Sequence, residues 1–142
     1  QKLKLALKLN LKPILCLGSK KKGVEEKEEI KKQIEEILKD LSLDDLFKII
    51  FAYEPIWAIS GFKKSQSATF LEAKRGGEMI KNFFKVKFKL KETEKIRIIY
   101  GGSVNKENAQ QFIKGGKMDG LLVGSASLKT EDFVEIIKAV LF

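Results

Sequence analysis

The feature that most constrains this chain is a repeated alternation between short apolar runs and longer amphipathic stretches. Four short runs are continuously apolar and end in small or polar residues, over 13–18, 47–53, 96–100 and 120–123. Between them, 25–41 and 70–88 carry apolar residues at helical spacing. Continuously apolar strands are typical of parallel sheets buried on both faces, and helix-length crossovers join parallel strands. The alternation therefore predicts an α/β fold with a parallel sheet.

Capping signals locate the helices more closely. Thr69 followed by Glu72 has the spacing of a capping box and predicts a helix that begins near residue 70. Thr130 is expected to cap the last helix. The remaining helices are expected over 3–9, 105–114 and 131–141.

No linker-like stretch divides the 142 residues, so a single domain over 1–142 is expected. On the alternation alone, a four-stranded doubly wound sheet and half of a (β/α)8 barrel explain the pattern equally well. In both architectures, ligands bind at the C-terminal ends of the parallel strands. The candidate functional residues are therefore those that follow the apolar runs.

Composition excludes several kinds of chemistry. The chain has no histidine, which removes the commonest metal ligand and general base, so neither a metal site nor another cofactor is expected. The one cysteine, Cys16, lies in an apolar run and is expected to be a buried core residue. A lone cysteine cannot form an internal disulfide, and this predicts a cytoplasmic location.

Charge and hydropathy argue against nucleic acid and membrane partners. The net charge is +9, but the lysines alternate with glutamates, as in 25–40, and this pattern indicates a solvated helix face. No apolar run approaches the roughly 18 residues that span a bilayer. The chain starts with Gln1 rather than Met, which predicts a fragment or a processed product.

The segment 52–59, AYEPIWAI, places a carboxylate at the end of an apolar run. A strand that reaches the surface would explain Glu54, and ordinary packing would explain Trp57. In the functional interpretation, Glu54 is a base whose pKa is raised by partial desolvation. Pro55 then fixes the pivot of the following loop, while Trp57 and Ile59 form the apolar underside of a lid.

Two small-residue turns follow the last two runs, at 101–103 (Gly-Gly-Ser) and 124–125 (Gly-Ser). Backbone N–H groups in such turns can hold a phosphate without a cationic side chain. Two of them on consecutive strands match the phosphate site of many barrels. Tight turns without any ligand explain the glycines equally well.

Three segments in this order resemble the triosephosphate isomerase family: AYEPIWAI at 52–59, IIYGGSVNKENA at 98–109 and DGLLVGSASL at 119–128. PILCLG at 13–18 matches the preceding strand, so the resemblance covers essentially the whole chain. The family is a (β/α)8 TIM barrel, and such barrels take about 250 residues. The resemblance implies that this chain is the C-terminal half, strands five to eight.

The resemblance also implies an isomerase of glycolysis and gluconeogenesis. It would interconvert dihydroxyacetone phosphate and D-glyceraldehyde 3-phosphate through an enediol(ate), with Glu54 as the base. The implied partners are a small phosphorylated triose and, for the full-length protein, a second copy in a homodimer. The implied phosphate-binding residues are Ser60, Ser103, Gly124 and Ser125, and the lid and latch residues are Pro55, Trp57, Ala58, Ile59, Gly61, Lys63 and Tyr100.

Some positions depart from the family pattern. Ser60 and Phe62 stand where the family's lid has glycines, and the lid is longer. Ser125 replaces the second glycine of the last turn, which is tolerable only if its φ is negative. Ser19 replaces a glutamate after 13–18, so a contact to Trp57 is expected to be lost.

The family's electrophilic His and its substrate-binding Asn and Lys lie in the first half of the barrel. This chain alone is therefore expected to be nearly inactive. Open sheet edges and an uncovered interior also predict that it associates. The alternative function is an incomplete half-barrel that self-associates or only binds phosphate.

Overall fold

The computed structural model describes residues 1–39, 41–59 and 67–141. Within these ranges, four parallel strands form one sheet in the order β1-β2-β3-β4. A doubly wound sheet would reverse its strand order at a switch point. No reversal occurs among the described strands, so the α/β prediction is confirmed and the doubly wound alternative is wrong. The strands are β1 (Ile14–Leu17), β2 (Ile50–Tyr53), β3 (Arg97–Tyr100) and β4 (Gly120–Leu121).

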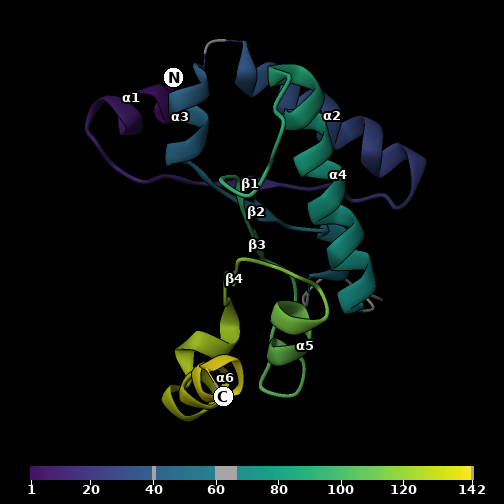
Figure 1. Ribbon diagram of the computed structural model, residues 1–142. Helices are drawn as coiled ribbons and strands as arrows, with labels where there is room; N and C mark the ends of the chain where they lie inside the picture. The colour runs from purple at the N-terminus through teal and green to yellow at the C-terminus, as the bar shows by residue number, and fades with distance from the viewer. Residues whose placement is uncertain (40, 60–66, 142) are drawn as a thin grey trace.

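Four of the described helices pack against one another in chain order. Helix α2 contacts α4, α4 contacts α5, and α5 contacts α6. Figure 1 shows the strands stacked from β1 to β4, with the two termini near opposite ends of the row. The helices are α1 (Lys2–Lys8), α2 (Val24–Leu38), α3 (Leu43–Lys48), α4 (Phe70–Phe88), α5 (Ala109–Lys114) and α6 (Thr130–Leu141), with 3₁₀ turns η1 (Ile56–Ala58) and η2 (Ser125–Leu128).

Helix α4 begins and ends where the sequence predicts. The Thr69 hydroxyl accepts the Glu72 N–H, and the Glu72 carboxylate accepts the Thr69 N–H at 2.8 Å, which completes the capping box. The glycine pair inside this helix has a packing reason. A Cβ on Gly76 would lie 2.4 Å from the Tyr53 ring, so only glycine lets α4 approach β2 this closely.

Helix α3 was not expected from the sequence. Residues 47–48 belong to α3 rather than to the strand predicted over 47–53, and the helix predicted over 25–41 ends at Leu38. A second capping box starts α3, because the Ser42 hydroxyl accepts the Asp45 N–H at 3.2 Å. The hydrogen bond from Ser42 lowers the pKa of the Asp45 carboxyl.

The two faces of the sheet differ in how far the helices cover them. The core lies on the face that meets the helices, where Phe51 packs on Phe84 with ring centroids 4.6 Å apart and Tyr100 stacks on Phe112 at 4.0 Å. On the other face of β1, Ile14 is 48% exposed and Cys16 is also exposed. The prediction of a buried Cys16 is therefore wrong, and so is burial of β1 on both faces.

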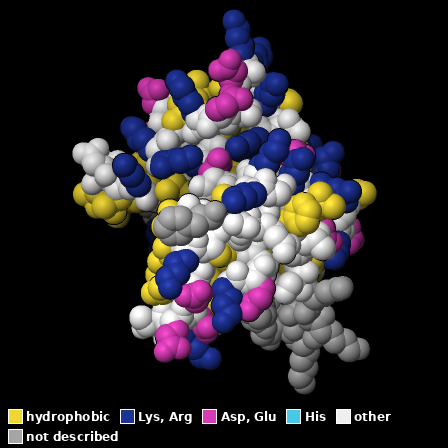
Figure 2. All heavy atoms as spheres, turned by 60° about the horizontal axis from the view of Figure 1, so that its bottom comes forward, with side chains coloured by type: hydrophobic (Ala, Val, Ile, Leu, Met, Phe, Trp, Pro, Cys, Tyr) yellow, Lys and Arg dark blue, Asp and Glu magenta, His cyan; other side chains and the backbone are white. Residues whose placement is uncertain are grey.

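The basic residues do not gather into a stripe on the face that Figure 2 shows. Lys and Arg side chains spread over that surface, with acidic side chains among them. Individual pairs such as Lys21–Glu25 and Lys138–Glu135, at 3.2 and 2.8 Å, lie along single helices or next to their starts. This distribution fits the solvated helix faces that the alternation of Lys and Glu predicts.

Candidate functional site

A cavity of about 700 Å³ opens at the C-terminal ends of the strands. Because the strands are parallel and in register, the residues that follow β2, β3 and β4 meet at one edge of the sheet. Glu54 follows β2, Gly101 follows β3, and Gly124 follows β4 by a few residues. The cavity is lined by Glu54, Ile59, Ser67, Gly101, Gly102, Ser103, Val104, Asn105, Leu122, Gly124, Ser125, Ala126, Lys129 and Asp132.

Glu54 is held at the floor of this cavity by its backbone. Its N–H donates to the Leu17 carbonyl at 2.8 Å, which extends the pairing of β1 and β2 by one residue. A Cβ on Gly18 would lie 1.7 Å from the Glu54 carbonyl oxygen, and a Cβ on Gly101 would lie 2.7 Å from Glu54 Cγ. Both neighbours must therefore be glycine for the half-buried Glu54 to occupy this position.

The Cys16 thiol lies beside the Glu54 carboxylate on the same face of the sheet. Partial desolvation, then a hydrogen bond with Glu54 and the charge of this group, raise the pKa of the thiol from 9.0 to about 11. A thiol with this pKa stays protonated near neutral pH and is a poor nucleophile. Cys16 is therefore a neutral neighbour of the carboxylate.

The segment after Glu54 is tied to two strand ends. The Ile56 N–H donates to the Ser19 carbonyl at 2.9 Å, after β1. The Ser103 hydroxyl donates to the Ala58 carbonyl at 2.9 Å, after β3. Pro55 is buried directly before the first of these attachments, with its φ at −66°. This part of the chain is a short, well-anchored turn directly beside the carboxylate.

Trp57 keeps an acidic partner despite the serine at position 19. Its indole Nε1–H donates to Glu26 Oε1 at 3.2 Å, and Glu26 comes from α2. The Ser19 side chain is itself buried and donates to Glu29 Oε2 at 2.5 Å. The serine at position 19 thus binds Glu29, and the acidic contact to Trp57 comes from Glu26 of the next helix.

Tyr100 does not line the cavity. Its ring lies on the helix-covered face, and its buried hydroxyl has no hydrogen-bond partner in the part of the chain that the structure describes. Burial first, and then the charge of Glu72, raise the pKa of this hydroxyl. A Cβ on Gly102 would lie 2.1 Å from the Tyr100 oxygen, so this glycine makes room for it. A buried hydroxyl without an acceptor is uncommon in native proteins.

Neither residue of the turn at 124–125 has a positive φ. Gly124 has a φ of −86°, and Ser125 is not among the residues with positive φ, so the serine causes no backbone strain. Ser125 opens η2, and the first N–H groups of such a turn lack partners within it. The turn is held by Ser127, whose hydroxyl donates to the Gly124 carbonyl at 2.7 Å. The arrangement suits a ligand that accepts hydrogen bonds.

Comparison of the sequence with known proteins identifies the family of this chain. The sequence model of the triosephosphate isomerase family matches residues 1–140. The chain belongs to the triosephosphate isomerase family. Relatives named triosephosphate isomerase are 44% identical over 142 residues in Fusobacterium nucleatum, 41% over 140 residues in Protochlamydia amoebophila and 38% over 143 residues in Dictyoglomus thermophilum. They match 98%, 96% and 98% of this chain, but the chain spans only 55%, 52% and 56% of their lengths.

Three residues that the isomerase resemblance assigns lie outside the described residues: Ser60, Gly61 and Lys63. Other residues of the site were missed from the sequence. Lys129 and Asp132 line the cavity, and Glu26 contacts Trp57, although no spacing rule connects any of them to the recognised segments. Lys129 lies directly after η2, Asp132 lies in the first turn of α6, and Glu26 belongs to α2, which packs against β1 and α4.

The described part of this isomerase-family chain contains no group of three or more His, Cys, Asp or Glu placed to hold a metal ion. Among the helices of the described residues, none is long and apolar enough to cross a bilayer.

Proposed function

We propose that this chain is the C-terminal half of a triosephosphate isomerase barrel, with residues 1–142 forming strands five to eight and their helices. Two observations support this. The chain spans between 52% and 56% of the length of its relatives. Its described strands follow one another in space without a reversal, as consecutive strands of a barrel do.

In the complete barrel, the enzyme interconverts dihydroxyacetone phosphate and D-glyceraldehyde 3-phosphate through an enediol(ate). The observation that carries this proposal is the position of Glu54 in one cavity with the turns at 101–103 and 124–125. Glu54 removes the proton from the carbon beside the substrate carbonyl. The two turns donate N–H groups to the substrate phosphate, and the Ser103 hydroxyl and the backbone of Ser125 contribute to the same site.

The segment that starts at Pro55 forms the hinge of a lid in this proposal. Trp57, Ala58 and Ile59 are its first residues, and the hydrogen bond from Ser103 to the Ala58 carbonyl supports a latch at this point. The Tyr100 hydroxyl, which is buried and has no hydrogen-bond partner among the described residues, supports a second latch. The roles of Ser60 in phosphate binding and of Gly61 and Lys63 in the lid stay predictions.

Several further properties belong to the complete protein. It needs an electrophile to polarise the substrate carbonyl, and this chain has no histidine. We therefore propose that the chain alone is nearly inactive. A cytoplasmic homodimer that works in glycolysis and gluconeogenesis is the expected form of the whole enzyme.

A second candidate is a half-barrel that self-associates or only binds phosphate. Exposed apolar side chains at both ends of the sheet favour it. Leu5 of α1 is 58% exposed, Leu9 at the end of that helix is 61% exposed, and Leu141 of α6 is 69% exposed. Such residues commonly mark a surface that another protein segment covers. In the first proposal the N-terminal half covers them, and in the second a further copy does.

Two measurements separate the candidates. The intact mass of the natural polypeptide is expected to be about twice the 16.1 kDa of this chain, and a mass near 16.1 kDa would favour the second candidate. Glu54→Gln in that polypeptide is expected to lower kcat about 10²- to 10⁴-fold, because the amide cannot accept the proton. Binding of inorganic phosphate should be retained. The matched control is Glu28→Gln, a change at an exposed position of α2, and unchanged turnover in the Glu54 variant would refute the assigned base.

A further inference from the structure

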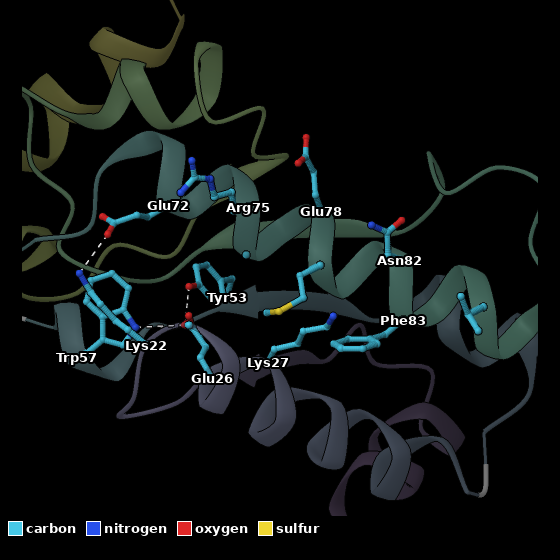
Figure 3. A pocket seen from close by; sticks show the side chains of 14 residues that line it. Lys22, Glu26, Lys27, Tyr53, Trp57, Glu72, Arg75, Glu78, Asn82 and Phe83 are labelled. Carbon is cyan, nitrogen blue, oxygen red and sulfur yellow. Dashed lines mark hydrogen bonds and ion pairs between the residues drawn. The ribbon is translucent and has the colours of Figure 1, made fainter.

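One carboxylate oxygen of α2 holds both ends of the segment that carries Glu54. Glu26 Oε1 accepts the Tyr53 hydroxyl at 2.7 Å and the Trp57 indole N–H at 3.2 Å. These two residues precede and follow the Glu54-Pro55-Ile56 tripeptide. Figure 3 shows Glu26 reaching from α2 towards both rings, at one end of a cavity of about 660 Å³ between α2 and α4.

Tyr53 is a fixed point for this contact. Its ring is only 1% exposed and packs so closely on α4 that a Cβ on Gly76 would clash with it. Burial first, and then the hydrogen bond and charge of Glu26, raise the pKa of its hydroxyl, so the tyrosine stays a neutral donor. Because successive residues of a strand point to opposite faces, Tyr53 faces the helices while Glu54 faces the catalytic cavity.

The Trp57 ring is held on its face as well as at its edge. Lys22 Nζ lies 3.8 Å from the ring centroid, within the range of a cation–π contact. The same ammonium pairs with Glu72 Oε1 at 3.1 Å, and the other Glu72 oxygen caps the start of α4. Lys22 and Glu26 therefore hold Trp57 between α2 and the first turn of α4 (Figure 3).

We propose that Glu26 is a positioning residue for Glu54. By binding Tyr53 and Trp57 through one oxygen, it fixes the backbone of residues 53–57 and thereby the direction of the Glu54 carboxylate into the cavity. This inference rests on the proposed isomerase function. It matters because a reacting group displaced by about 1 Å can lose as much as 10²-fold in rate.

The test uses the natural polypeptide that contains this sequence, with Glu26→Ala, Glu26→Gln and the control Glu28→Ala. Glu28 lies on the same helix, is exposed, and gives the same change in charge. Glu26→Ala is expected to lower kcat about tenfold with little change in KM, since the substrate contacts remain. Glu26→Gln keeps an oxygen that accepts both hydrogen bonds and should retain most of the turnover, and Glu28→Ala should match the parent.

Trp57 is the only tryptophan of this chain and reports the contact independently of catalysis. After subtraction of a Trp57→Phe blank, Glu26→Ala should shift its emission to longer wavelength and increase quenching by acrylamide. Unchanged emission in Glu26→Ala would show that the contact does not hold Trp57. Shifted emission with parental kcat would refute the positioning role, as would an equal loss of kcat in Glu26→Gln and Glu26→Ala.

Failure of the proposed function can be told apart from failure of the contact between Glu26 and Trp57. A parent polypeptide without isomerase activity would refute the proposed function and the positioning role together. The emission of Trp57 would still decide whether Glu26 holds this segment.

Discussion

The helix-covered face and the open face belong to the same four-stranded sheet but have different roles. On the covered face, Phe51, Tyr53, Ile98 and Tyr100 are at most 1% exposed and pack against α4 and α5. On the open face, the described structure leaves Ile14 and Cys16 exposed, and Glu54 follows at the strand end. The covered face holds the fold together, and the open face carries the candidate chemistry.

The two faces meet two different requirements, which are stability of the fold and access of a substrate to the carboxylate. A buried aromatic stabilises the fold through the area that it removes from water. A catalytic carboxylate must instead stay accessible to substrate, so its face can be closed only by ligand, by other parts of the chain or by another chain. Three experiments test this comparison of the two faces, from the largest expected effect to the smallest.

The first change is Phe51→Ala on the covered face. Phe51 is fully buried against Phe84, so its removal leaves a cavity that the helices cannot fill. The free energy of unfolding of the natural polypeptide is expected to fall by about 3–5 kcal/mol. Urea unfolding followed by circular dichroism measures this. A loss below about 1 kcal/mol would show that this face is not the one that holds the fold together.

The second test is the reactivity of Cys16 on the open face. Desolvation and the Glu54 carboxylate raise the pKa of the thiol to about 11, so the thiolate forms only well above neutral pH. At pH 8, iodoacetamide should therefore modify the folded 142-residue chain about 100-fold more slowly than a thiol of pKa 9.

The rate of this modification should rise towards pH 11, as the thiolate fraction grows. Glu54→Gln removes the negative charge, which lowers the pKa of Cys16 and should speed the reaction at pH 8. Equal rates of Cys16 modification in the two proteins would show that the Glu54 carboxylate does not act on the thiol. This result would contradict the geometry of the open face.

The third change is Ile14→Ala, also on the open face. Since Ile14 is 48% exposed, its loss should cost the 142-residue chain about 1 kcal/mol of unfolding free energy. If other strands of a complete barrel cover this face, the same change should cost about 2–5 kcal/mol in the natural polypeptide. Equal costs in both proteins, from matched urea titrations, would argue that the face stays open.

Parts of the fold were predictable because their signals are local. The capping box of Thr69 and Glu72 placed the start of α4 at the observed residue. The apolar runs placed β1 and β3 to within a residue or two. Helix α3 was missed because Leu46, Phe47, Ile49 and Ile50 form an apolar run that reads as the start of a strand, although Ser42 and Asp45 carry the signal of a helix start.

The candidate site was predictable only in part. Glu54 and the turns at 101–103 and 124–125 were found because small or acidic residues follow apolar runs, and they line one cavity. Glu26 was missed because it lies 31 residues from Trp57 in the chain and meets it only when α2 packs against β1 and α4. Tyr100 was expected among the lid contacts, and this role stays a prediction, because its buried hydroxyl has no hydrogen-bond partner among the described residues.

The sequence by itself determined the order of helices and strands, the capped start of α4 and the identity of the residues at the strand ends. These depend on periodicity and on contacts between residues three or four apart. Only the tertiary structure decided the strand order, the exposure of Cys16 and the acidic partner of Trp57. Each of these depends on which distant segments pack together, and the local pattern is the same whether the face of a strand ends up covered or open.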